Sequence, residues 1–233
     1  MKFIRFTCLG PLSLVLWTGC ATSPPSCCAP GDGLADGNPV AAVTDRDRAV
    51  SVPATNDFAT PFLPPAARPL MALNHKVTTQ DGKVRTLREL VDRPMAISFA
   101  YSQCSNPNKC PRVVNAMGIL RGELEGASLL GGVRLAVITY DPVHDTPGVM
   151  RGFAKVNGYR LDDQALFLRP EVDSDHRLFH DLGIRASFND GGIALHGIQL
   201  LLLDKQGRLA RTYHTLLWDD PDVIRDLRKL TEE

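Results

Sequence analysis

From Met71 onward the chain alternates short apolar runs with amphipathic stretches, and this alternation constrains its fold more than any other feature. Compact apolar runs predict buried strands at 95–101, 133–140, 165–168, 198–204 and 209–213. Amphipathic stretches with helix-start signals predict helices at 86–91, 110–125, 146–157, 175–182 and 221–230. This order predicts an α/β protein with a thioredoxin-like fold, in which a central mixed β-sheet is flanked by helices on both faces.

Composition divides the chain into one domain and a tail. With 233 residues and 44% hydrophobic content, one substantial core is expected. Residues 20–70 hold nine of the seventeen prolines and show no sustained period, so we expect a flexible Pro-rich tether there. The folded domain is expected at 71–233.

The amino terminus has the pattern of an export signal. A charged start, Met1 to Arg5, precedes the mostly apolar run from Phe6 to Trp17 and the small pair Thr18-Gly19. Gly19-Cys20 resembles the end of a bacterial lipobox, although Trp17 stands where such signals usually carry leucine. We therefore expect a lipoprotein-type signal peptide at 1–19 and lipidation of Cys20; the alternative is an ordinary signal peptide with an incidental cysteine. The first interpretation places the protein on the periplasmic side of a bacterial envelope, lipid-anchored to the inner or outer membrane.

Charge excludes one class of partner. Lysine and arginine equal aspartate and glutamate at 26 each, so no net field draws the chain to a polyanion. Nucleic-acid binding is not expected.

Only two of the six cysteines, Cys104 and Cys110, lie in the expected domain. They occupy the polar loop between a buried strand and a helix that starts at Cys110-Pro111, where the helix field favours a thiolate at Cys110. Cys27 and Cys28 lie in the tail, and exposed, dispensable thiols are the favoured interpretation there. The spacing of Cys104 and Cys110 fits a redox pair, a structural disulfide or two metal ligands.

His196 favours the metal among these alternatives. It lies in Gly-Gly-Ile-Ala-Leu-His-Gly, just before the strand at 198–204, and a thioredoxin-like fold places this segment against the cysteine loop. Two thiolates and an imidazole suit copper in either oxidation state.

Together these motifs resemble the Sco/SenC family over about residues 72 to 230. The resemblance is carried by Phe99-Ala-Tyr-Ser-Gln-Cys104, Cys110-Pro111, Tyr140-Asp-Pro-Val-His-Asp-Thr-Pro147, His196, Leu201 to Gly207, and Arg211-Thr-Tyr213. It implies copper ligation by Cys104, Cys110 and His196. It also implies copper delivery to the binuclear centre of cytochrome c oxidase subunit II, or reduction of that centre's cysteines. The family usually has three residues between the cysteines, whereas this chain has five, so we expect a bulged loop from which both sulfurs still reach one metal.

Two further functions compete with a copper metallochaperone. A thiol-disulfide oxidoreductase acting on an envelope protein needs only Cys104 and Cys110. A binding module with a structural disulfide ranks last, because a crosslink within this one loop would constrain only a few residues.

The remaining polar candidates are expected to be structural. Surface positions are expected for His144, His176 and His180, and no partner is evident for His75 or His214. Asp141 and Asp145 are expected to cap the following helix and fix its loop.

Overall fold

The computed structural model describes residues 58–173, 176–189, 192–216 and 220–233. The expected signal peptide, Cys20, Cys27, Cys28 and tether residues 20–57 lie outside these ranges. Within them, no helix is both long and apolar enough to cross a membrane.

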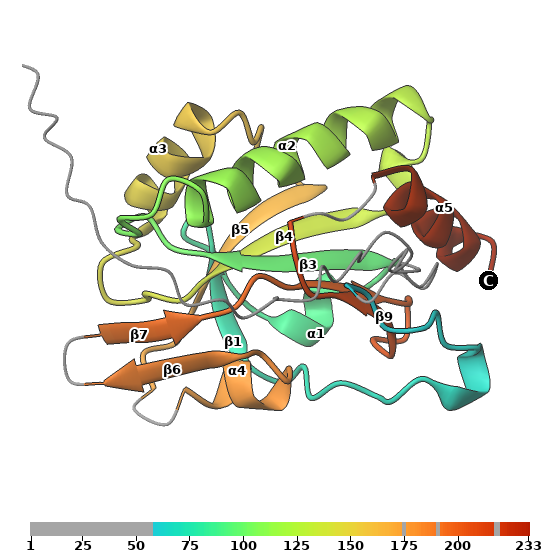
Figure 1. The fold of residues 1–233 in the computed structure, drawn as a ribbon, viewed down its shortest axis with the longest axis horizontal. Helices are drawn as coiled ribbons and strands as arrows, with labels where there is room; N and C mark the ends of the chain where they lie inside the picture. Colours follow the sequence, from blue (N-terminus) through green and yellow to red (C-terminus); the bar gives the residue numbers. More distant parts are fainter. Residues whose placement is uncertain (1–57, 174–175, 190–191, 217–219) are drawn as a thin grey trace, which may run out of the picture. The chain divides into compact units, whose positions relative to one another are not determined.

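A seven-stranded mixed sheet forms the centre of the domain, in the order β2-β1-β5-β4-β3-β8-β9 (Figure 1). Its strands are β1 Lys76–Thr79, β2 Val84–Thr86, β3 Met95–Ala100, β4 Arg134–Thr139, β5 Ala165–Pro170, β8 Leu200–Leu203 and β9 Leu209–Tyr213. β3, β4 and β5 are parallel, and the other pairs are antiparallel. All six residues of β3 are buried, as expected for a central strand covered on both faces.

Helices cover both faces of this sheet, as predicted (Figure 1). One core contains side chains of α2 Cys110–Gly126, α3 Pro147–Val156 and α5 Asp220–Thr231. The other contains side chains of α1 Leu87–Leu90 and α4 Arg177–Asp181. Along β3, Ala96 and Ala100 belong to the first core while Ile97 and Phe99 belong to the second, because alternate strand residues point to opposite faces. The α/β class is therefore confirmed.

A second, two-stranded sheet was not predicted. β6 Ala186–Asn189 pairs antiparallel with β7 Gly192–His196, and the register shifts between Ser187 and Phe188. Both strands are short and mostly exposed or half-buried, so they lack the apolar run by which the other strands are recognised. This hairpin places His196 at its end.

Residues 58–70, part of the expected tether, contact the domain. Ala59 bridges Tyr213, and Leu70 bridges Arg208, so this segment follows the exposed edge of β9. Arg68 is buried and hydrogen-bonds to Asp204 and Glu233. These contacts begin before Met71, where the sequence places the boundary, because irregular backbone on a sheet edge has no periodic signal.

Candidate metal centre

The loop between β3 and α2 carries both cysteines. Asn106 organises it: its side-chain oxygen accepts from the Asn108 N–H at 2.9 Å, and its carbonyl accepts from the Lys109 N–H at 3.1 Å. Such a local turn is the typical use of asparagine. Lys109 occupies the N-cap position without a capping side-chain hydrogen bond, and Cys110 is the first helical residue, followed by Pro111. The five residues between the cysteines thus form a compact turn.

Asp145 fixes the start of this loop by hydrogen bonds. Its buried carboxylate accepts from the Ser102 N–H at 3.2 Å and from the hydroxyls of Ser102 and Thr139. It therefore joins the start of the cysteine loop to the end of β4. The expected loop-fixing role is confirmed for Asp145, but the expected capping role is wrong, because the Thr146 hydroxyl accepts from the Val149 N–H and caps α3.

His196 approaches the cysteines from the other side. Its ring lies 5.1 Å from the Tyr140 ring and 5.5 Å, edge to face, from the Tyr101 ring. Its Nδ1 lies 3.3 Å from the Gly197 carbonyl, which can only accept, so this contact places the ring proton on Nδ1. The lone pair is then on Nε2, which faces the two sulfurs.

The three donor atoms form a tight group. Nε2 of His196 lies 3.9 Å from Sγ of Cys104 and 3.8 Å from Sγ of Cys110, and all three atoms are within 4.8 Å of one another. If one metal ion were bound at about 2.3 Å to each sulfur and 2.0 Å to the nitrogen, Nε2 would lie roughly 3.5–3.7 Å from each sulfur. The group is therefore close to ligating geometry. Among the described residues it is the one cluster of three such donors.

The two thiols differ in their surroundings. Cys110 is fully buried, and this burial raises the pKa of its thiol well above the usual value. Burial also opposes ionisation of Cys104, but hydrogen bonds with the backbone of Cys110 and Asn106 outweigh it, so the pKa of Cys104 is lowered. The sequence predicts a helix field that favours a thiolate at Cys110, but in the structure burial raises the pKa of the free thiol instead.

The imidazole and the neighbouring phenol remain neutral. Burial lowers the pKa of His196, which keeps Nε2 unprotonated and able to ligate. Burial and the nearby thiols raise the pKa of Tyr101 to about 12. Tyr101 and Tyr140 hold His196 in place. The sequence did not identify this role, because an aromatic residue next to a buried strand predicts only a core position.

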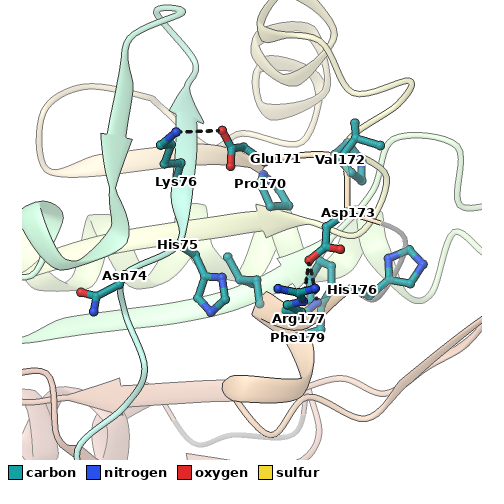
Figure 2. Close-up of a pocket in the computed structure, with 12 residues that line it drawn as sticks. Asn74, His75, Lys76, Pro170, Glu171, Val172, Asp173, His176, Arg177 and Phe179 are labelled. Atoms are coloured by element: carbon teal, nitrogen blue, oxygen red, sulfur yellow. Dashed lines mark hydrogen bonds and ion pairs between the residues drawn. The ribbon is translucent and has the colours of Figure 1, made fainter.

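The other histidines lie apart from this group. His75 and His176 line a cavity of about 570 Å³ between β1 and α4, together with the ion pairs Lys76–Glu171 and Asp173–Arg177 (Figure 2). His75 does have a partner, because its Nε2 lies 2.9 Å from Asp181. His176 stacks on Phe188 with ring centroids 3.6 Å apart.

His144 and His180 are exposed, as predicted, with 57% and 89% of their side chains accessible. His144 also pairs with Asp141. His214 has a buried Nδ1 without a hydrogen-bond partner among the described residues.

A mixed sheet covered on both faces, with a cysteine pair at a strand-to-helix turn and an imidazole opposite, defines a thioredoxin-like protein with a group able to hold a metal ion. The SCO1/SenC family matches residues 65–232, and the chain belongs to that family. No curated protein matches the chain.

Several solved structures share the fold. A SCO1/SenC family lipoprotein from Bacillus anthracis is 22% identical, with a TM-score of 0.59, and the match covers 70% of this chain and 99% of that chain. BsSco, a Sco family cytochrome c oxidase assembly protein in which a disulfide switch was identified, is 20% identical, with a TM-score of 0.60 and coverage of 71% and 96%. Copper-bound ScoI from Bradyrhizobium japonicum is 22% identical, with a TM-score of 0.54 and coverage of 70% and 99%. The thioredoxin-like fold is thereby confirmed.

Proposed function

We propose that this chain is a copper-binding metallochaperone of the bacterial cell envelope. In this proposal Cys104, Cys110 and His196 hold one copper ion as cargo. The observation that carries it is the convergence of two sulfurs and Nε2 within 4.8 Å. Thiolates select Cu(I), and an imidazole suits copper as well, so the donor set is appropriate to either oxidation state.

Family membership supports copper over other metals. ScoI of Bradyrhizobium japonicum, which has the same fold, was solved with copper bound. Copper binding also explains how Cys110 can ionise despite its burial, since a coordinating metal deprotonates a thiol. The ion would replace the solvation that Cys110 loses by burial.

The proposed destination is cytochrome c oxidase. BsSco is an assembly protein of that enzyme, and the binuclear copper centre of its subunit II is the acceptor we propose here. We also propose that Cys20 carries a lipid and that residues 20–57 let the domain reach an acceptor from the membrane on the periplasmic side. The lipoprotein from Bacillus anthracis supports this placement.

Copper titration of the reduced protein tests the binding. We expect about one copper per chain and a thiolate-to-copper charge-transfer band, the stoichiometry of a single two-thiolate, one-imidazole group. His196→Ala should weaken binding by at least about 100-fold, the upper end of what loss of an outer-shell partner costs a metal site. His180→Ala, which removes an exposed imidazole on α4, is the matched control. Unchanged affinity in His196→Ala would contradict the proposal.

A thiol-disulfide oxidoreductase is the second candidate, and the unequal thiols favour it. Cys104 is the more accessible and has the lower pKa, as a nucleophile requires, while Cys110 is buried behind it. The Cys104 thiolate would attack a substrate disulfide, form a mixed disulfide and release one substrate thiolate. Cys110, after losing its proton, would then attack Sγ of Cys104, which forms the Cys104–Cys110 disulfide and releases the second substrate thiol.

Cys110→Ser, studied without metal, tests the redox activity by itself. An oxidoreductase with this substitution should accumulate the mixed disulfide, because the resolving sulfur is missing. Mass spectrometry of the metal-free variant with an oxidised envelope protein measures that species. Its absence would count against the redox function without affecting the copper titration.

A further inference from the structure

A cavity of about 490 Å³ adjoins the three-donor group but shares none of its ligands. Its walls come from the cysteine loop, from the loop after β4 and from the β6–β7 hairpin, represented by Gln103, His144 and Ile193. These loops converge where the parallel strands β3 and β4 end, which is the usual place for a ligand in such sheets.

His144 and Asp141 form an oriented pair in this cavity. Nδ1 of His144 lies 2.8 and 3.0 Å from the two carboxylate oxygens of Asp141, and the His144 backbone N–H donates to the same carboxylate at 3.1 Å. A carboxylate can only accept, so Nδ1 carries the proton and the lone pair is on Nε2. Metal-ligating histidines typically show this arrangement, in which a carboxylate fixes the ring and makes the other nitrogen more basic.

The pair is accessible, and its surroundings favour a cation. The His144 side chain is 57% exposed, whereas that of Asp141 is only 12% exposed. A half-enclosed carboxylate attracts a metal ion more strongly than one in open solvent, because screening is weaker. The cavity can therefore receive an ion from solution.

The cavity shares two wall residues with the surroundings of the three-donor group. Gln103, in its wall, directly precedes Cys104, the more accessible of the two cysteines. Tyr101, also in its wall, packs its ring edge to face against His196 at 5.5 Å. Tyr101 thus contacts both the cavity and the imidazole ligand.

We propose that His144, held by Asp141, is a capture ligand that binds the incoming copper ion through Nε2 and passes it to Cys104. This inference rests on the copper-binding function proposed above. Transfer is a ligand exchange: a bond from copper to Sγ of Cys104 forms as the bond to Nε2 of His144 breaks, without change of oxidation state. The thiol proton of Cys104, where present, leaves to solvent.

Stopped-flow mixing of the full chain with Cu(II) tests the transfer, followed by the thiolate-to-copper band. We expect His144→Ala to slow uptake by about tenfold, the lower end of what loss of an orienting partner costs a metal site. The equilibrium affinity should not change, because His144 is not a ligand of the final complex. His180→Ala, which removes a more exposed imidazole paired to Asp181, should leave the rate unchanged. Equal rates in the wild type and His144→Ala would overturn the proposal.

A second measurement separates this inference from the proposed function. In a full chain with all six cysteines changed to alanine, Cu(II) broadens the NMR signals of the imidazoles that it contacts. The His144 signals should broaden at a lower Cu(II) concentration than those of His180, and Asp141→Asn should abolish the difference. Simultaneous broadening of His144 and His180 would overturn the capture role, whether or not the cysteine group binds copper. The wild type could instead take up no copper at the cysteines while the His144 signals of the cysteine-free variant still broaden first. That result would contradict the proposed function alone.

Discussion

Nε2 of His196 lies 3.8 Å from Sγ of Cys110, although 86 residues separate them in the chain. Cys110 is fixed by the first turn of α2, and His196 by the end of a hairpin outside the main sheet. Among the described residues, the rings of Tyr101 and Tyr140 and the carbonyl of Gly197 contact the imidazole. The geometry of the group therefore depends on the packing of Tyr140, which directly follows β4, and of Tyr101 in the cysteine loop.

The first prediction concerns the order in which the two thiols react. Only the thiolate is alkylated, the pKa of Cys104 is lowered, and that of buried Cys110 is raised. With metal-free protein at pH 7, iodoacetamide should modify Cys104 at least about tenfold faster than Cys110, a conservative bound given how strongly thiol reactivity follows thiolate fraction. Peptide mass spectrometry resolves each cysteine. Equal rates would mean that Cys110 is more accessible than the structure shows.

The strand-to-helix loop that carries the cysteines could be predicted because its signals in the sequence are local. The apolar run of β3 and the Cys110-Pro111 helix start identify the strand-to-helix loop directly, because burial on both faces and proline at a first turn leave clear patterns. The placement of His196 against that loop followed from the fold rather than from any pattern around the residue. In this fold, the order of the elements along the chain determines that the cysteine loop and the segment of His196 are neighbours.

Other features could not be predicted from the sequence, because they depend on tertiary packing. The β6–β7 hairpin has few buried residues, and one of its anchors, Phe188, packs on His176 and Phe179. The raised pKa of Cys110 is a consequence of neighbours that are distant in the sequence. The helix field acts on this thiol, but the sequence does not report how much water the fold removes from it.

The second prediction concerns Asp145, the carboxylate under the cysteine loop. Asp145→Ala removes the acceptor of the buried Thr139 hydroxyl and of the half-buried Ser102 donors. Unfolding free energy should fall by about 3 kcal/mol, as expected for lost hydrogen bonds to a buried charge. Urea unfolding measures this, with Asp163→Ala on an exposed turn as the control. A loss below about 1 kcal/mol, the value of one ordinary hydrogen bond, would show that the loop does not depend on Asp145.

The third prediction links Arg68 to stability in acid. Burial opposes ionisation of Asp204, but hydrogen bonds from Arg208 and Arg68 outweigh it and lower its pKa. A hydrogen bond from Arg68 likewise lowers the pKa of Glu233. Carboxyls with a lowered folded pKa stabilise the protein above their unfolded pKa, and this contribution is lost as the pH falls through the folded pKa.

Arg68→Met should therefore make the protein less stable at neutral pH and less sensitive to acid. Without Arg68, the pKa values of Asp204 and Glu233 in the folded state lie closer to their unfolded values, so fewer protons are taken up on unfolding. Between about pH 5 and 2, the stability of the variant should therefore decline more gently than that of the wild type. Urea midpoints measured across this range test the slope. Lys83→Met, a cation lost from the exposed turn between β1 and β2, should leave the slope as in the wild type. Parallel profiles for Arg68→Met and the wild type would contradict the assignment.

The last prediction compares two glycines one helical turn apart on α2, the helix that begins with Cys110. A Cβ on Gly118 would lie 2.5 Å from the carbonyl oxygen of Gly158, which is backbone and cannot move aside without shifting the end of α3. A Cβ on Gly122 would meet nothing within 4 Å. Gly118→Ala should thus destabilise the protein by about 1–3 kcal/mol through overpacking. Gly122→Ala should stabilise it by about 0.5–1 kcal/mol, because alanine loses less backbone entropy in a helix. Since helix propensity contributes equally at both positions, the difference between their urea midpoints isolates the contact of α2 with Gly158. Shifts in the same direction for both variants would show that α2 and the end of α3 are not in contact at Gly118.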